Sequence, residues 1–345
     1  MEISRGHGGN KPGTQSVPLA GRLDGYRWRV SAATFRMGVV VFDRMKSTWA
    51  TAAAFIAVAA LLSSGAASPR KLGAQIPQFA APRPPVQPGL YVALGDSYTG
   101  GPFIPVPRYD PAGCLRSDHN YPHLVAAALG FRLRDVSCSG ATTQDMTSPQ
   151  AVTPGPNPPQ FDALTIHTKL VTMGIGGNDI GFSDILKHCF SPTPFGAPCQ
   201  DHYVVNGRDE ISERLAAAAP KVAAVIQGIH RRSPAARVYV VDYLDILPLT
   251  GDGCWPQMPI ASADMPYLRA KEIELNTMLA HVAGANRAGL VDAYTASIGH
   301  DACQFPTVRW VEPAVPTSPA APVHPNVAGM EGTAYAVLRE ILVRR

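Results

Sequence analysis

One serine of the chain lies where a hydroxyl group could act as a nucleophile. Ser97 follows the apolar run Leu90–Leu94 through Gly95 and Asp96, so it stands at the end of an expected strand. A serine hydroxyl attacks a carbonyl carbon efficiently when a base takes its proton. By itself, Gly-Asp-Ser is more typical of a turn, because all three residue types favour turns. The tripeptide therefore needs partners elsewhere in the sequence.

Two glycine-containing motifs also follow expected strands directly. Ser-Gly-Ala-Thr contains Gly140 and comes after the second apolar segment, and Gly-Ile-Gly-Gly-Asn-Asp contains Asn178 and comes after the third. Because parallel strands end at the same edge of a sheet, Ser97, Gly140 and Asn178 can converge there. The backbone N–H groups of Ser97 and Gly140 and the amide of Asn178 would then form an oxyanion hole.

The base that such a serine needs is predicted to be one of ten histidines. His324 stands apart because it lies in Pro-Val-His-Pro-Asn, just before the last helical segment, with Asn326 placed to cap that helix. The competing interpretation is a solvated loop histidine. No comparable setting surrounds the other nine: His7, His119, His123, His167, His188, His202, His230, His281 and His300.

In this order the four motifs resemble the sequence blocks of the SGNH/GDSL hydrolases. The resemblance extends from about Tyr91 to the C-terminus and is closest to exported esterases and lipases of the actinobacterial type. It implies that Ser97 is the nucleophile and His324 its base. It further implies an oxyanion hole made by Ser97, Gly140 and Asn178, and hydrolysis of a carboxylic ester through an acyl-enzyme. No metal ion or organic cofactor is expected.

One position departs from the family pattern. Most members have an aspartate three residues before the histidine, where it orients the imidazole, whereas this chain has Ala321. Some of the similar esterases use a Ser-His dyad, in which the backbone carbonyl at that position accepts the histidine N–H. We therefore expect the carbonyl of Ala321 to orient His324. A carbonyl supplies less charge stabilisation than a carboxylate, and Asp292 and Asp301 are the acids that could compensate.

Other functions remain open on the same residues. The apparatus could transfer the acyl group to an alcohol, as an acyltransferase, or act as a carbohydrate deacetylase. The missing aspartate also leaves room for a non-catalytic lipid- or glycan-binding surface protein. A glycosidase site at Asp96 and Asp179 is less consistent, because aspartates at strand ends usually cap loops. Asp179 also replaces the third glycine of a dinucleotide-binding loop.

The order of elements predicts an α/β fold. Short apolar strands are expected at 90–94, 133–137, 169–173, 237–242 and 290–292, and helices at 211–229, 267–288 and 327–342, with Pro220 kinking or dividing the first. Alternating strands and helices predict a three-layer α/β/α sandwich with a parallel, flavodoxin-like sheet. The long loops at 98–120, 148–160, 189–206, 251–264 and 299–323 are expected to form binding walls or lids. Phe195, Trp255 and Trp310 could line an apolar channel, although buried loop anchors are the commoner fate of such aromatics.

The cysteines suggest disulfides. All six, an even number, follow the apolar N-terminal stretch, and they show no Cys-x-x-Cys spacing of the kind that zinc sites use. The residues alone leave the pairing open. The resemblance implies bonds in sequence order, which are Cys114–Cys138, Cys189–Cys199 and Cys254–Cys303.

The N-terminal region is predicted to direct export. Met45 and Lys46, the apolar run Trp49–Leu62 and the small residues up to Ala67 form the pattern of a signal peptide over 45–67, with an uncleaved anchor as the alternative. Residues 1–44 are expected to be an extension that precedes the true start, 68–88 a proline-rich linker, and 89–345 the hydrolase domain. The protein is therefore expected to be secreted to the extracellular space or cell envelope.

The charge balance bears on the partners. Residues 1–67 hold eight of the 30 Lys and Arg residues and three of the 26 Asp and Glu residues, so the remainder has 22 basic and 23 acidic residues. A nearly neutral chain lacks the basic footprint of a nucleic-acid binder. The expected partner is an ester or lipid substrate, with no stable protein partner and with transient contact with membrane or envelope lipid.

Overall fold

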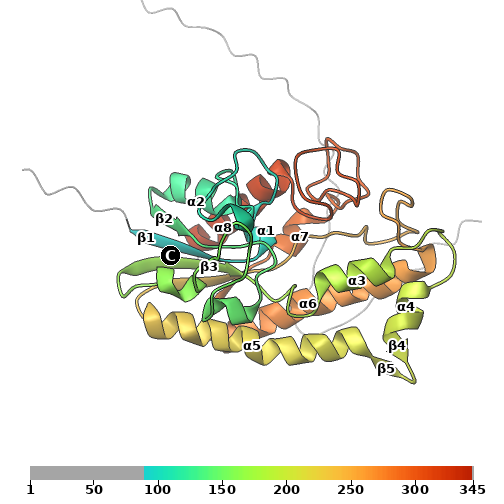
Figure 1. The fold of residues 1–345 in the computed structure, drawn as a ribbon, viewed down its shortest axis with the longest axis horizontal. Helices are drawn as coiled ribbons and strands as arrows, with labels where there is room; N and C mark the ends of the chain where they lie inside the picture. The colour runs from blue at the N-terminus through green and yellow to red at the C-terminus, as the bar shows by residue number, and fades with distance from the viewer. Residues whose placement is uncertain (1–88, 344–345) are drawn as a thin grey trace, which may run out of the picture. The chain divides into compact units, whose positions relative to one another are not determined.

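The computed structural model describes residues 89–343, and it contains a five-stranded parallel sheet with the order β2-β1-β3-β6-β7 (Figure 1). The strands are β1 (Leu90–Gly95), β2 (Arg132–Asp135), β3 (Thr168–Gly174), β6 (Arg237–Val241) and β7 (Gly289–Val291). In the register of β1 and β3, Gly95 lies opposite Gly174, so both strands end at the same level. The segments that follow these two strands are therefore neighbours at the carboxyl edge of the sheet.

Helices cover both faces of the sheet. Leu90, Val92 and Leu94 of β1 belong to one core cluster together with residues of α5 (Glu210–Arg232) and α6 (Met265–Ala285). Tyr91 and Ala93 belong to a second cluster with residues of α2 (Tyr121–Leu129) and α8 (Val327–Val343). Successive side chains of a strand point to opposite faces, so this division identifies a helical layer on each side of the sheet. The predicted α/β/α sandwich is confirmed.

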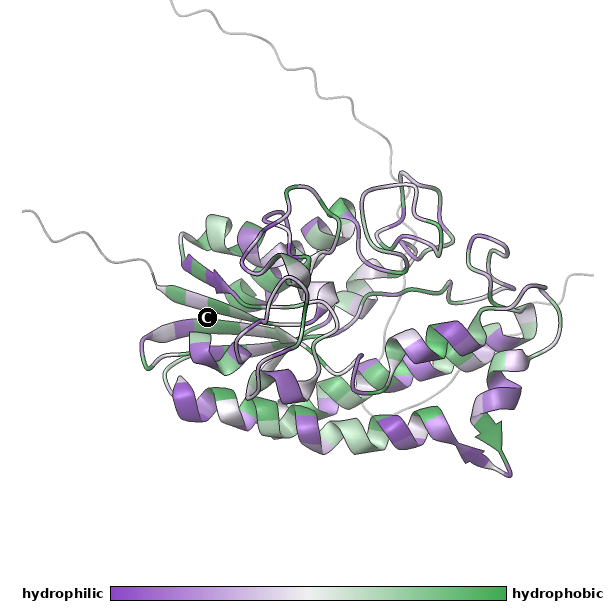
Figure 2. Cartoon of the chain, in the orientation of Figure 1, coloured by the Kyte–Doolittle hydropathy of each residue, from purple (hydrophilic) through white to green (hydrophobic). Residues whose placement is uncertain are grey.

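The hydropathy pattern explains why the helices pack in this way. In Figure 2, α5 and α6 carry hydrophobic and hydrophilic positions in alternation along their length. On α5 the buried positions include Ile211, Leu215, Val222 and Ile229, which recur at helical spacing. Such a stripe is stable only when it is covered, and α6 and the sheet provide the cover.

The remaining elements are short and lie at the ends of the strands or in the long loops. They are the helices α1 (Ser97–Gly100), α3 (Phe182–Cys189), α4 (Pro198–Tyr203) and α7 (Ala293–Ser297), the hairpin of β4 (Val204–Val205) and β5 (Arg208–Asp209), and the 3₁₀ helices η1 (Ala112–Cys114), η2 (Thr143–Met146), η3 (Gln160–Ala163) and η4 (Ser262–Asp264). The loops thus carry much of the surface around the carboxyl edge of the sheet.

Pro220 does not divide the helix in which it lies. Of the two expected effects, kinking or dividing the helix, division is wrong, because α5 runs without interruption from Glu210 to Arg232 with Pro220 inside it. A proline removes one helical hydrogen bond, to the carbonyl four residues earlier. That carbonyl belongs to Ala216, which is exposed, so water can satisfy it. The apolar contacts of α5 with α6 and the sheet then hold the helix together.

Three disulfides tie the loops to the framework, and they join Cys114 to Cys138, Cys189 to Cys199 and Cys254 to Cys303. This is the pairing that the family resemblance implies. The extension at 1–44, the signal peptide at 45–67 and the linker at 68–88 lie outside the described residues. Within residues 89–343, the helices are too short or too polar to span a bilayer.

Gly95 permits close packing at the carboxyl edge of the sheet. Its φ of +148° is rare for other residues, and a Cβ there would lie 2.4 Å from the Thr99 hydroxyl and 2.5 Å from the Gly174 carbonyl oxygen. We expect Gly95→Ala to lower the free energy of unfolding by about 2–4 kcal/mol in urea titrations. Gly284→Ala is the matched control, because that exposed position in α6 has nothing within 4 Å of an added Cβ. Equal stability of the two variants would contradict this assignment.

Candidate active site

Ser97 is the first residue of α1 and follows β1 after a single residue, Asp96. Asp96 caps the short helix: a carboxylate oxygen accepts the N–H of Tyr98 at 2.9 Å, and its carbonyl accepts the N–H of Thr99 at 3.2 Å. The N–H groups of the first helical turn have no acceptor inside the helix. The N–H of Ser97 is therefore positioned by the helix start and free of helical bonding.

The structure brings Ser97 and His324 into direct contact. Nε2 of His324 lies 2.8 Å from Oγ of Ser97, across 227 positions of the sequence. The imidazole packs against two aromatic rings, with centroid distances of 5.1 Å to Tyr98 and 6.3 Å to Phe182. Nucleophile and base are thus within hydrogen-bond reach, which is the geometry that proton transfer from a serine requires.

The other imidazole nitrogen identifies the tautomer. Nδ1 of His324 lies 2.7 Å from the carbonyl oxygen of Pro322, and a carbonyl can only accept. Nδ1 therefore carries the proton, and Nε2 faces Ser97 as an acceptor. Burial lowers the pKa of His324 from 6.5, and the hydrogen bond to Pro322 opposes this shift. The ring is accordingly neutral near pH 7 and able to accept a proton.

The expected role of the Ala321 carbonyl is wrong. That carbonyl accepts the backbone N–H of His324 at 3.2 Å, whereas the imidazole is held by the next carbonyl, that of Pro322. The reason lies in Val323, whose φ of +58° turns the chain between Pro322 and His324. A β-branched residue rarely adopts this conformation, so surrounding contacts must hold it.

Two contacts hold Val323. The Tyr98 hydroxyl donates to the Val323 carbonyl at 2.7 Å, and the Val323 N–H donates to the Glu312 carbonyl at 3.1 Å. Tyr98 is also the residue after Ser97. One side chain next to the serine therefore supports the turn that carries His324.

A buried ion pair anchors the histidine loop to α8. Glu312 pairs with Arg309 at 2.8 Å, and their side chains are almost completely buried. Asn326 donates to Glu312 at 2.8 Å and to the Arg309 carbonyl at 3.0 Å, while its own oxygen accepts the N–H of Gly329 at the start of α8. The predicted cap at Asn326 is confirmed. The chain on both sides of His324 is thereby fixed to the core.

Asn178 and Ser97 line the same pocket. Gly140 directly precedes Ala141, the residue that the Asn178 side chain contacts. Nδ2 of Asn178 donates to the Ala141 carbonyl at 2.9 Å, which leaves its second amide hydrogen for another acceptor. Gly140 has a φ of +78°, and the N–H of Cys138, two residues earlier, donates to the Gly95 carbonyl at 3.0 Å. The second and third motifs are thus joined to each other and to the end of β1. Their role as an oxyanion hole stays a prediction.

A buried hydrogen-bond chain that the sequence does not reveal connects these segments. The Gly177 N–H donates to the Tyr243 hydroxyl at 2.7 Å, and this hydroxyl donates to Asp96 at 2.6 Å. Burial raises the pKa of Asp96 to about 7, although the Tyr243 bond opposes the rise. In the sequence, the only indication that Tyr243 belongs to the site is its position just after the strand β6 and Asp242.

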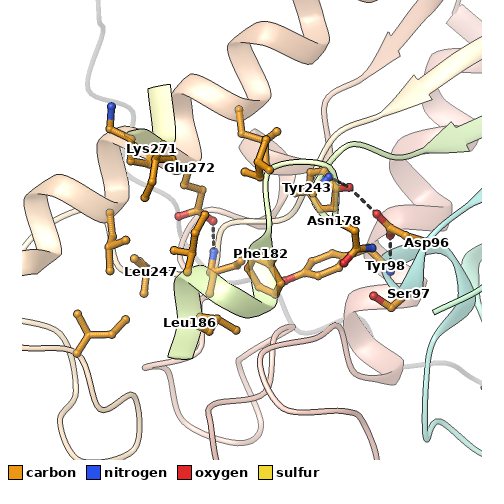
Figure 3. Close-up of a pocket in the computed structure, with 18 of the residues that line it drawn as sticks. Asp96, Ser97, Tyr98, Asn178, Phe182, Leu186, Tyr243, Leu247, Lys271 and Glu272 are labelled. Carbon is orange, nitrogen blue, oxygen red and sulfur yellow. Dashed lines mark hydrogen bonds between the residues drawn. The ribbon is translucent and has the colours of Figure 1, made fainter. Parts of the chain in front are cut away.

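A long apolar pocket, which we call the acyl pocket, opens from Ser97, Tyr98 and Asn178 toward α3 and α6. Its empty volume is about 810 Å³. Its apolar lining includes Phe182, Ile185, Leu186, Ile260, Leu268 and Leu275. Figure 3 shows Ser97, Tyr98 and Asn178 at one end, with Leu247, Glu272 and Lys271 away from them.

Glu272 is the acidic residue in the distal wall of this pocket. Burial raises its pKa well above 4.5, and one carboxyl oxygen accepts the Ile246 N–H at 2.6 Å. Burial therefore favours the neutral form of the carboxyl group. The pocket wall is then compatible with an apolar ligand despite this residue.

Other residues singled out from the sequence lie away from His324. Asp292 caps α7 by accepting the Thr295 N–H, and Asp301 accepts from Cys303 and Gln304, so the contacts of both acids are with their own loops. The three aromatics are not part of the acyl pocket lining: Phe195 is 79% exposed, Trp255 donates to the Ser191 carbonyl, and Trp310 stacks on His300. Within residues 89–343, no three His, Cys, Asp or Glu side chains are grouped to hold a metal ion.

Comparisons with known proteins agree with this arrangement. The model of the GDSL-like Lipase/Acylhydrolase family matches residues 93–331. Lipase 2 of Streptomyces coelicolor is 42% identical over 248 residues, which cover 69% of this chain and 81% of that protein. A phospholipase A1 from Streptomyces albidoflavus and an extracellular lipase from Streptomyces rimosus each superpose with a TM-score of 0.62 at 25% identity. Each match covers 73% of this chain and 99% of the other.

The protonation state of His324 is open to direct measurement. Because burial lowers its pKa, we expect the His324 imidazole to titrate with a midpoint below 6.5 in NMR spectra of ¹³C-labelled protein. The signal is assigned by its loss in His324→Gln. A midpoint at or above 6.5 would show that the ring is charged where the site needs a base.

Proposed function

The chain belongs to the GDSL-like lipase/acylhydrolase family and is a carboxylic ester hydrolase, and from that premise we propose that it is a secreted lipase with a Ser97–His324 dyad. The observation that carries the proposal is the 2.8 Å contact between Ser97 Oγ and His324 Nε2. The contact joins an unprotonated nitrogen to a hydroxyl at the mouth of the acyl pocket. It supports catalysis rather than simple ligand binding.

The proposed reaction has two halves. In the first, His324 Nε2 takes the Ser97 proton while Oγ bonds to the ester carbonyl carbon, and the carbonyl electron pair moves to oxygen. The tetrahedral intermediate collapses, the bond to the alcohol breaks, and His324 gives its proton to the departing alcohol. In the second, a water attacks the acyl-enzyme by the same steps and releases the acid and free Ser97.

Donors around Ser97 stabilise the negative oxygen in this proposal. The Ser97 N–H is free of helical bonding, Asn178 retains one amide hydrogen, and Gly140 is one residue from the carbonyl that holds Asn178. Loss of one such donor typically costs about 10²–10³ in rate. The Pro322 carbonyl has the orienting role here, because it fixes the tautomer in which Nε2 accepts.

The acyl pocket favours acyl chains longer than acetyl. Its aliphatic lining extends from the serine to α6, and burying apolar carbon there is favourable by about 25 cal/mol per Å². An acetyl group would leave most of that lining without contact. This observation favours a lipase over a carbohydrate deacetylase that removes acetyl groups.

Secretion and lipid contact fit the same proposal. Three disulfides are typical of proteins that fold in an oxidising compartment, and one structural relative is described as an extracellular lipase. Phe195 is 79% exposed and Trp255 is 38% exposed in the loops next to the acyl pocket. Exposed aromatics around a substrate pocket suit transient contact with a lipid surface.

Replacement of the nucleophile tests the proposal. Ser97→Ala is expected to lower kcat on p-nitrophenyl esters by at least about 10³-fold, because no other group can form the acyl-enzyme. Ser183→Ala, which changes an exposed serine on α3, is the matched control and should retain wild-type activity. Comparable thermal midpoints establish that both variants fold.

The same assay separates the alternatives. Full activity in Ser97→Ala would rule out this serine, and no activity in the wild type toward any ester would support a binding protein. Product analysis with an added alcohol then distinguishes hydrolysis from acyl transfer. An alkyl ester as the main product in water would favour an acyltransferase.

The acyl pocket can be shortened without change to the dyad. Leu186 is half-buried on α3 and lines the pocket, so Leu186→Trp should fill part of the chain path. We expect kcat/KM for a decanoate ester to fall about tenfold, while that for acetate stays within about twofold. Ile166→Trp, at a position that is 67% exposed before β3, is the matched control. An equal loss on both esters would mean that the chain binds elsewhere.

A further inference from the structure

The three donors expected to bind the oxyanion each need a fixed direction. The Ser97 N–H is directed by the start of α1, and the Asn178 amide by its bond to the Ala141 carbonyl. The Gly140 N–H donates to no acceptor within residues 89–343, and Gly140 itself is exposed. This N–H is therefore free to bind a substrate oxygen, and its direction depends on the peptide unit that carries it.

The Gln150 side chain holds that peptide unit from its other end. Nε2 of Gln150 donates to the Ser139 carbonyl at 2.9 Å. The Ser139 carbonyl and the Gly140 N–H belong to one planar trans peptide and point in opposite directions. A bond that fixes the carbonyl oxygen on one side thus fixes the N–H on the other. The same bond polarises the peptide, which makes its N–H a stronger donor.

The loop that carries Gln150 is itself fixed. Gln150 and Asn157 exchange both backbone hydrogen bonds, at 2.9 and 3.1 Å. The turn between them is held at Pro154, whose carbonyl accepts the Gly113 N–H at 2.9 Å. The loop is thereby attached to η1, which ends at the disulfide-bonded Cys114. The side chain of Gln150 therefore starts from a defined position.

The burial of Gln150 argues against a role in packing alone. Gln150 is 8% exposed, and its Oε1 is buried without a hydrogen-bond partner within residues 89–343. A buried oxygen without a partner lowers the stability of a fold. What the amide provides is its bond to the peptide between Ser139 and Gly140.

We propose that Gln150 is a positioning residue for ester hydrolysis, which directs the Gly140 N–H at the oxyanion, an inference that rests on the proposed function. Gln150 acts through the peptide between Ser139 and Gly140 and does not itself contact the ester. The carbonyl oxygen of the ester gains its negative charge only as the tetrahedral intermediate forms, so a well-directed N–H stabilises the transition state more than the bound ester. Loss of Gln150 should therefore lower kcat and leave KM almost unchanged.

Removal of the amide is the first test. Gln150→Met keeps the length of the side chain and removes the donor. We expect its kcat on p-nitrophenyl butyrate to fall about 10–100-fold, with KM within about threefold of wild type, because the Gly140 N–H stays in place but loses its fixed direction. Asn157→Leu is the matched control: it removes a buried amide of the same loop whose Nδ2 donates to no acceptor, and it should keep wild-type kinetics. Thermal midpoints establish that both variants fold.

The pH dependence of a second variant tests the hydrogen bond itself. In Gln150→Glu, a carboxylate faces the Ser139 carbonyl, and both groups can only accept. As the pH falls, the carboxyl group takes a proton and its hydroxyl can donate to that carbonyl. We expect the ratio of kcat in Gln150→Glu to kcat in wild type to rise at least about threefold from about pH 8 to about pH 5.5. Division by wild type removes the titration of His324, and Gln150→Met should give a ratio that does not change with pH.

The outcomes separate this proposal from the proposed function. An unchanged kcat in Gln150→Met, an equal fall in Asn157→Leu, or a change in KM alone overturns the positioning role, even where Ser97→Ala is inactive and the proposed function stands. A ratio for Gln150→Glu that does not rise at low pH also overturns it, and this ratio decides alone if Gln150→Met does not fold. Full activity in Ser97→Ala overturns the proposed function and the positioning role with it.

Discussion

The hydrogen bond between Ser97 and His324 depends on nearly the whole described fold, because its partners come from the first strand and the last loop. Ser97 is fixed by the end of β1, where Gly95 allows the close approach of Thr99 and the Gly174 carbonyl. His324 is fixed from the other side by Glu312, Arg309 and Asn326. Between them, Tyr98 spans the gap by bonding the Val323 carbonyl. A displacement of the end of β1 or of the loop that carries His324 would therefore change the contact between Ser97 and His324.

Buried polar groups hold this edge of the sheet together. Asp96 accepts from Tyr98 and Tyr243, and Tyr243 in turn accepts from Gly177, so the first and third motif segments share one network. A buried carboxyl group is costly unless it is hydrogen-bonded, which makes the network sensitive to the loss of any member. Glu272 shows the same constraint in the acyl pocket, where burial favours its neutral form. The apolar acyl pocket and the polar carboxyl edge of the sheet can thus be neighbours.

The fold could be predicted because its signals are local. Short apolar runs predict buried strands. Apolar positions at helical spacing, such as those of α5, predict amphipathic helices that pack against another layer. The contact of Ser97 with His324 also agrees with the prediction, since each residue lies directly beside a regular element. The partner of His324 Nδ1 could not be predicted, because the choice between the Ala321 and Pro322 carbonyls depends on the φ of Val323. That angle is held by Tyr98 and Glu312, which are remote in sequence.

The most direct test of the dyad is the site of covalent modification by a fluorophosphonate, which reacts with activated serines. Intact protein is labelled, digested and mapped by mass spectrometry, with His324→Ala labelled in parallel. The account predicts a single adduct on Ser97 that is largely lost in His324→Ala. An adduct on another residue, or undiminished labelling of Ser97 without His324, would contradict it.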